Sequence, residues 1–192
     1  MILEGIVTTI NEDGSVNISP MGPIVNESMS RFVLRPYQTS TTYHNLKRIG
    51  EGVFHVTDNV EMLARAAISE LTELPDMIQA EKITGFILTD ACRWYGFRTT
   101  LLDDHEERTR IECEVVDSGR QRDFIGFNRA KHAVVEAAIL ATRIGILPDD
   151  QINEETQRLA TIVEKTAGSQ EKRAFAFLQK FIQKTEHGRT RP

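Results

Sequence analysis

Up to about residue 122, apolar and polar positions alternate over short runs, as they do in half-buried β-strands. Residues 2–10 predict a first strand, and the NEDGS segment at 11–15 holds an Asp-Gly pair that is typical of a hairpin turn. The returning strand covers 16–25, where two prolines and a glycine predict a bend or a sheet edge. Further strands are expected at residues 31–37, 52–57, 83–90, 91–102 and 108–119.

Apolar residues at helical spacing interrupt this first half twice and then fill the second half of the chain. The two early helices are expected at residues 42–49 and 60–71, and three later ones at residues 127–147, 149–168 and 169–184. Strands followed by helices favour an antiparallel sheet or barrel with an appended helical bundle. The sequence therefore predicts a mainly β fold with α elements, with one domain at 1–122 and a small C-terminal helical domain at 123–192.

Composition narrows the class of protein. The 192 residues are 40% hydrophobic and 27% charged, with a net charge of -5, which argues against a nucleic-acid partner. No apolar run approaches the roughly 20 residues of a membrane span, so no membrane partner is expected. Cys92 and Cys113 lie in strand-like patterns without metal-ligand spacing. We therefore expect reduced thiols, no metal and a cytoplasmic protein.

The segment RPYQTSTTYHNL at residues 35–46 holds the densest group of candidate ligand-binding side chains. It places an arginine ahead of four successive hydroxyl side chains, and a helix follows: Arg35, Thr39, Ser40, Thr41 and Thr42. A helix N-terminus attracts anions, hydroxyls add donors, and an arginine can bind a phosphate in bidentate fashion. One hydroxyl could simply cap the helix, which would explain one residue but not four. The segment indicates a phosphate site.

Several residues around this segment carry a family resemblance. After the Asp-Gly hairpin and the polar strand VNISPMGPI, the chain reads TSTTYHNLKRIGEGVFHVTD. This run resembles the pattern of the flavin reductase-like FMN-binding split barrels, with matching positions at Thr42, Asn45, Gly50 or Gly52, Phe54 and Val56. With its C-terminal helices, the chain is similar to a two-domain branch of that superfamily.

The resemblance implies an antiparallel Greek-key split β-barrel that forms a homodimer, with FMN near the subunit interface. The phosphate would lie against Arg35 and the hydroxyl run of residues 39–42. The isoalloxazine or ribityl group would be lined by residues of the second strand, namely Asn17, Ser19, Met21 and Gly22. Asn45 would brace this loop or touch the cofactor.

In such proteins the flavin carries the electron chemistry and the protein positions it, so no conventional catalytic residue is assigned. The resemblance implies an oxidoreductase that transfers hydride or electrons, with a small-molecule substrate or an electron donor such as NAD(P)H. One alternative is a non-catalytic binding protein for FMN or another phosphorylated heterocycle. Another alternative is chemistry like that of the pyridoxamine-phosphate oxidases, although no additional residue of the sequence supports it.

The long helix expected at 127–147 holds a polar stripe at helical spacing, formed by Arg129, His132, Glu136 and Arg143. The rest of its surface is largely apolar, so the helix is expected to be buried. The stripe then predicts either an ion-pair seam between helices or a substrate pocket to which His132 and Arg129 contribute.

Overall fold

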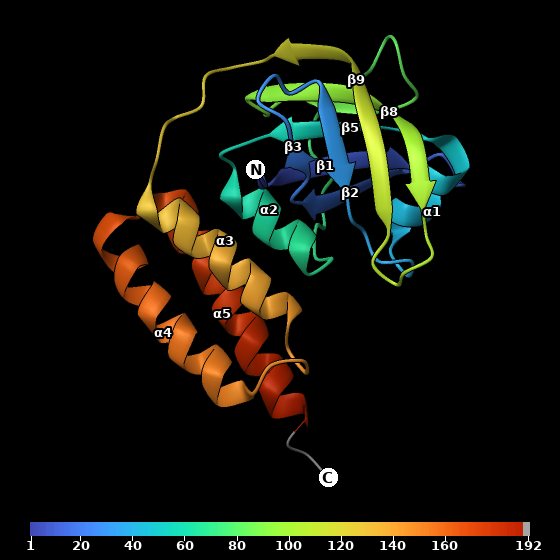
Figure 1. The fold of residues 1–192 in the computed structure, drawn as a ribbon. Helices are drawn as coiled ribbons and strands as arrows, with labels where there is room; N and C mark the ends of the chain where they lie inside the picture. Colours follow the sequence, from blue (N-terminus) through green and yellow to red (C-terminus); the bar gives the residue numbers. More distant parts are fainter. Residues whose placement is uncertain (190–192) are drawn as a thin grey trace. The chain divides into compact units, whose positions relative to one another are not determined.

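The computed structural model describes residues 1–189 and is drawn in Figure 1. Its contacts divide the chain into two compact units. The β unit comprises Met1–Thr57 and Glu73–Phe124, and the helical unit comprises Asp58–Thr72 and the residues from Ile125 on. The domain boundary predicted between residues 122 and 123 stays a prediction, and residues 190–192 of that predicted helical domain lie outside the described residues.

Most element bounds lie close to the predicted ranges, but the short strand Met77–Gln79 had no predicted counterpart, and the second helix ends at Ala67 instead of residue 71. The strands are β1 (Gly5–Ile10), β2 (Val16–Met21), β3 (Ile24–Val25), β4 (Arg31–Leu34), β5 (Glu51–Val56), β6 (Met77–Gln79), β7 (Phe86–Leu88), β8 (Arg93–Asp103) and β9 (Arg110–Arg120). The helices are α1 (Thr41–Ile49), α2 (Val60–Ala67), α3 (Arg129–Thr142), α4 (Asp149–Thr166) and α5 (Ser169–Arg189). None of the described helices is both long enough and apolar enough to cross a bilayer.

Seven strands form one antiparallel sheet in the order β2-β1-β5-β8-β9-β4-β3. The first hairpin pairs Gly5 with Met21 and Ile10 with Val16, and its turn uses Gly14 at φ 83°. A positive φ is a conformation that glycine adopts without steric cost. The predicted Asp-Gly hairpin thus sets the register of β1 and β2.

The predicted strand at 16–25 divides at its glycine and proline into two strands on opposite edges of the sheet. β2 ends at Met21, and β3 pairs with β4 instead. Ile2, just before β1, bridges Ile24 of β3. Contacts between the first residues and β3 make the sheet curl toward itself, as Figure 1 shows. The predicted mainly β fold with a split antiparallel barrel and C-terminal helices is confirmed.

Apolar side chains pack on both faces of the sheet. The inner cluster includes Phe32, Phe54 and Phe97, whose rings meet edge to face with centroids 5.4 to 6.2 Å apart. On the other face, Val53 packs against Ile87 and neighbouring residues of the β6–β7 hairpin. Edge-to-face contact is the favourable geometry for aromatic pairs. The two clusters bury the apolar side chains on both faces of the central strands.

His55 of β5 is fully buried and holds two elements together. Its Nδ1 lies 3.2 Å from the carbonyl of Ile6, and the N–H of Leu88 donates to its Nε2 at 3.1 Å. Accepting at Nε2 and donating at Nδ1 requires the neutral ring. Burial lowers the pKa of His55 to about 4, because a charged imidazolium would lose its hydration.

The helical unit packs through small side chains and one buried ion pair. Figure 1 shows α3, α4 and α5 running side by side, and the buried face of α3 is mostly alanine. Nζ of Lys131 donates to Oε1 of Glu171 at 2.7 Å and to the carbonyl of Asp58 at 2.7 Å. α3 stops at Thr142, short of the predicted residue 147, because the chain turns through Gly145 at φ 85°.

Candidate functional site

The N-terminus of α1 lies in the hydroxyl-rich segment of the β unit. Ser40 is its N-cap: its Oγ accepts from the N–H of Tyr43 at 3.2 Å and donates to the carbonyl of Tyr37 at 2.8 Å. The first amides of a helix have no partner within the helix, which here concerns Thr41 and Thr42. The first turn holds no acidic side chain. These amides can therefore bind an anion.

Arg35 lies between β4 and α1 and is half-buried. Its Nε is a buried nitrogen without a hydrogen-bond partner among the described residues. Its carbonyl accepts from Nε of Arg108 at 3.3 Å, while the nearby Thr39 is exposed. Leaving a buried charged donor unpaired costs at least about 1–3 kcal/mol. The guanidinium thus has hydrogen-bonding capacity that fits a phosphate oxygen.

A network of neutral polar side chains connects β1, β2 and α1. Nδ2 of Asn17 donates to Oγ1 of both Thr9 and Thr42 at 3.1 Å. Nδ2 of Asn45 donates to Oγ1 of Thr9 at 3.0 Å and to Oδ1 of Asn11 at 2.8 Å. Three predicted site residues are therefore brought together, and Thr9, which sequence reasoning missed, joins them.

The other predicted residues of this strand lie toward its end. Ser19 and Met21 share one face of β2, and Met21 packs against the inner cluster. Gly22 follows directly, where an added Cβ would lie 2.8 Å from Oε1 of Glu4 and 2.9 Å from Cγ2 of Ile2. The close approach of residues 2–4 thus favours glycine at this position. Any direct contact of these three residues with a ligand stays a prediction.

Charged and polar contacts fix α1 to the loop between β8 and β9. The hydroxyl of Tyr43 donates to Oδ2 of Asp104 at 2.6 Å, and Nζ of Lys47 lies 2.8 Å from the same oxygen. The hydrogen bond from Lys47 is the main cause that lowers the pKa of Asp104. Nε2 of Gln38 also donates to the carbonyl of Asp104 at 2.8 Å. The start of α1 is therefore held on a fixed support.

Arg129 and His132 belong to the helical unit, where both are exposed on α3. His132 lies 3.8 Å from Glu136 one turn along the helix, and its side chain is 72% exposed. The face of α3 that packs inside the unit is formed by other residues, among them Ala133 and Ala137. Both residues thus belong to the helical unit, and their part in a substrate pocket stays a prediction.

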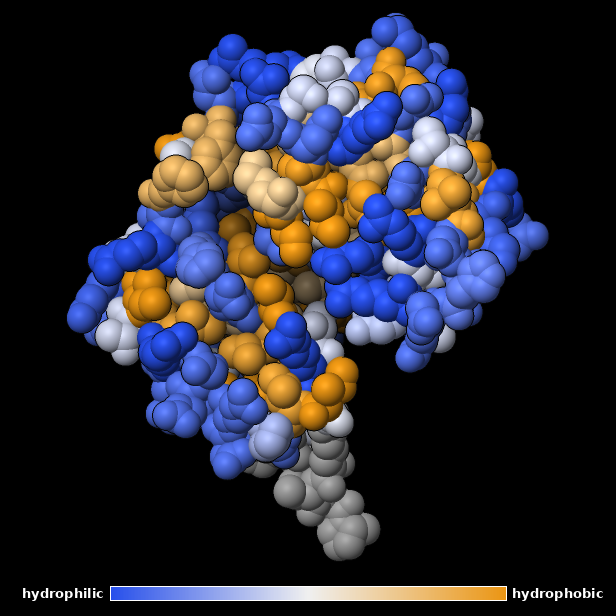
Figure 2. Space-filling view, in the orientation of Figure 1, coloured by the Kyte–Doolittle hydropathy of each residue, from blue (hydrophilic) through white to orange (hydrophobic). Residues whose placement is uncertain are grey.

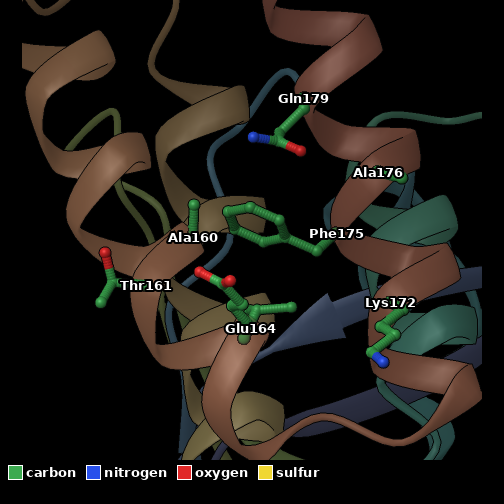
Figure 3. A pocket seen from close by; sticks show the side chains of 8 residues that line it. Ala160, Thr161, Glu164, Lys172, Phe175, Ala176 and Gln179 are labelled. Carbon is green, nitrogen blue, oxygen red and sulfur yellow. The ribbon is translucent and has the colours of Figure 1, made fainter.

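A hollow of about 350 Å³ lies between α4 and α5 of the helical unit. Figure 3 shows Phe175 of α5 pointing across it toward Ala160 of α4. Its one acid and one base, Glu164 and Lys172, are both exposed. Among the described residues, no group of three or more His, Cys, Asp or Glu side chains could hold a metal ion. We assign no ligand to this hollow.

Two family models match the chain. The model described as "Protein of unknown function (DUF447) N-terminal domain" matches residues 3–122, and the model described as "Protein of unknown function (DUF447)" matches residues 128–180. The chain belongs to the DUF447 family. No curated protein sequence matches this DUF447 chain significantly.

Solved structures share the fold of the DUF447 chain. An FMN-bound DUF447 protein from Methanosarcina mazei superposes with a TM-score of 0.80 at 21% identity, covering 94% of each chain. An FMN-binding protein from Thermus thermophilus, with bound 1-cyclohex-2-enone, gives 0.53 at 12% identity over 62% of this chain and 70% of that one. An NADH:FAD oxidoreductase from Streptomyces globisporus gives 0.51 at 11% identity, also over 62% and 70%. The predicted resemblance to the FMN-binding split barrels is confirmed.

Proposed function

We propose that this DUF447 protein binds FMN in its β unit and uses it to transfer hydride or electrons. The observation that carries the proposal is the buried Nε of Arg35, which has no partner in the described part of the chain, in the segment that leads into α1. The M. mazei protein of the same family is FMN-bound, and it superposes over nearly the whole chain.

The donor chemistry of this segment fits the phosphate of FMN. A phosphate accepts hydrogen bonds from several directions, and the segment supplies a guanidinium, two amides at the helix start without an acceptor among the described residues, and the exposed hydroxyls of Thr39 and Thr41. When bound, FMN would supply the electron chemistry. The chain would hold the phosphate at α1 and line the rest of the cofactor from β2, where Asn17, Ser19, Met21 and Gly22 are the proposed residues.

We also propose that the protein acts as a homodimer. Figure 2 shows apolar side chains gathered on the visible face of the β unit, with polar ones around them. Several large apolar residues of this unit are exposed, including Met1 at 78% and Ile2 at 54%. Exposed apolar patches mark interaction surfaces. Analytical ultracentrifugation is expected to give twice the mass of the chain, and a monomer at micromolar concentration would contradict this part of the proposal.

The absorbance spectrum after mixing with FMN and desalting tests cofactor binding. Retained flavin bands are expected, and a colourless protein would contradict the proposal. Bleaching of the bound flavin by NADH or NADPH is then expected, since the S. globisporus neighbour is an NADH:FAD oxidoreductase. Retained colour without bleaching by any donor would favour the second candidate, a non-catalytic FMN-binding protein. A cytoplasmic location stays a prediction.

A further inference from the structure

Polar side chains of the first hairpin and α1 form a hydrogen-bonded relay, in which neighbouring contacts fix the orientation of Asn11 and of Asn45. At one end, the hydroxyl of Ser15 donates to Oδ1 of Asp13 at 2.6 Å. Because Ser15 has only one hydroxyl hydrogen, its Oγ must accept the bond that Nδ2 of Asn11 makes at 2.9 Å. Asn11 therefore turns its carbonyl Oδ1 toward Asn45.

At the other end, Arg48 fixes the orientation of Asn45. A guanidinium can only donate, and Nη2 of Arg48 lies 3.4 Å from Oδ1 of Asn45 and also donates to the carbonyl of Ile10. Nδ2 of Asn45 then faces Asn11 and Thr9, so both of its N–H groups are used within the protein. Asn45 is only 5% exposed, which suits a support rather than a ligand contact.

Thr9 connects this arrangement to β2. Its side chain is fully buried, and its Oγ1 accepts from Asn45 and from Asn17, which is its partner in the strand register. Asn17 gives its second N–H to Thr42. Its Oδ1 remains, and no residue that the structure describes donates to that oxygen. Asn17 is half-exposed on β2, an edge strand of the sheet.

We propose that Thr9 and Asn45 are positioning residues that hold the amide of Asn17 with its carbonyl Oδ1 toward the bound flavin. That oxygen accepts a hydrogen bond from a donor of the flavin, either a ribityl hydroxyl or the imide N–H of the ring. The inference rests on the proposed FMN function. It adds that this strand selects ligands with a hydrogen-bond donor at this point, because an amide carbonyl cannot pair with an acceptor.

Thr9→Val tests the relay, since valine keeps the shape and removes Oγ1. Its matched control is Thr8→Val: Thr8 is equally buried, but its hydroxyl donates to the carbonyl of Phe86 on the other face of the sheet. In a fluorescence titration, Thr9→Val is expected to weaken FMN and riboflavin alike, by about fivefold. Thr8→Val is expected to leave both affinities unchanged, and Thr9→Ser to restore them.

A double-mutant cycle separates positioning from general loosening of the fold. In an Asn17→Ala background, Thr9→Val is expected to cause no further loss of affinity, because no amide is left to position. An equal loss in both backgrounds, or unchanged affinity of Thr9→Val, overturns the inference. If Thr9→Val does not fold, Asn45→Ala, which removes the donor to Thr9, takes its place in the same cycle. Lumiflavin keeps the imide N–H but lacks the ribityl chain. If Thr9→Val weakens lumiflavin as well, the donor is the imide, and if it does not, the donor is a ribityl hydroxyl.

FMN binding by the unmodified protein distinguishes a failure of the proposed function from a failure of the inference about the relay. If the unmodified protein binds no flavin, the proposed function fails, and the relay has no ligand to position. If it binds FMN while the cycle shows no coupling between Thr9 and Asn17, only the inference about the relay fails.

Discussion

The two units differ in the polar side chains that they bury. The β unit buries neutral groups, such as Thr9, Asn45 and His55, each of which takes part in more than one hydrogen bond. The helical unit buries the charged pair of Lys131 and Glu171, whose side chains are 17% and 7% exposed. A neutral network can leave one atom for a ligand at modest cost, whereas a buried charged group without a partner is costly, so the Nε of Arg35 gains most from a bound anion.

This contrast suggests a division of labour. The pair in the helical unit joins α3 to α5, and Lys131 also binds the carbonyl of Asp58 just before α2. The role of this ion pair is to stabilise the packing of the helices against each other. The neutral network of the β unit leaves Oδ1 of Asn17 without a donor among the described residues, and the buried Nε of Arg35 is likewise unpaired there. We therefore expect ligand recognition in the β unit.

The largest expected effect is the loss of the buried pair. Lys131→Met leaves the carboxylate of Glu171 buried without its partner, which costs about 3–5 kcal/mol of unfolding free energy. Denaturation in urea, followed by circular dichroism, measures this loss. The control is Arg158→Ala, which removes an exposed pair with Glu155 and should change stability by at most about 0.5 kcal/mol. Comparable small losses for both variants would show that the pair does not hold the helical unit.

Acid is expected to weaken the β unit before the helical unit. The pKa of His55 falls from 6.5 to about 4 on burial, so the stability that its neutral ring provides is complete above pH 6.5 and is lost as pH falls toward 4. This difference corresponds to about 3 kcal/mol. Burial by itself would raise the pKa of the Glu171 carboxyl. Its hydrogen bonds, first among them the one from Lys131, lower this pKa to below 4.5. The pair of Lys131 and Glu171 therefore stays charged until the pH falls below 4.5.

Urea midpoints at pH 7.5 and pH 5, read from Trp94 fluorescence in the β unit, test this order. The unmodified chain is expected to lose stability between the two values, and His55→Gln to lose much less, because glutamine does not titrate. An equal pH dependence in both proteins would show that other groups cause the acid sensitivity.

Much of the fold was predictable because local signals decide it. Alternating apolar positions set the strands, and the Asp-Gly turn set the first hairpin. The division of the 16–25 strand was not predictable in full, since β3 joins the far edge only through β4 and through contacts with the first residues of the chain. Similarly, α2 lies in the first half of the sequence, but its contacts place it in the helical unit. Both outcomes depend on contacts between distant segments.

The candidate site was predictable where side-chain chemistry is conspicuous. An arginine before a hydroxyl run draws attention by composition alone. Thr9 does not, because a threonine in a strand is an ordinary β-former. Its role follows from register: counting back from the Asp-Gly turn pairs Thr9 with Asn17, and that pairing was the available signal. The contact between Asn11 and Asn45 depends on where α1 packs against the first hairpin, and no local sequence pattern predicts that position.

The phosphate contact is the next effect in size. Arg35→Ala with Thr41→Ala is expected to weaken FMN by about 2–3 kcal/mol, because a charge-assisted contact and a hydroxyl donor are removed together. Riboflavin, which lacks the phosphate, should lose little. Parallel fluorescence titrations of both ligands measure the difference, and Thr39→Ala serves as a single-hydroxyl comparison. Equal losses for FMN and riboflavin would place the phosphate elsewhere.

Ser40→Ala tests whether the Ser40 hydroxyl only caps α1 or also contacts the ligand, and its effect on FMN affinity is expected to be the smallest. Its hydroxyl already donates to the carbonyl of Tyr37 and accepts from the N–H of Tyr43, so it has no hydrogen left for a phosphate. Ser40→Ala should therefore lower the unfolding free energy by about 1 kcal/mol, as the loss of an N-cap does. The ratio of FMN to riboflavin affinity should stay near that of the unmodified chain. A ratio that falls as far as with Arg35→Ala would mean that Ser40 gives up its cap when the phosphate binds.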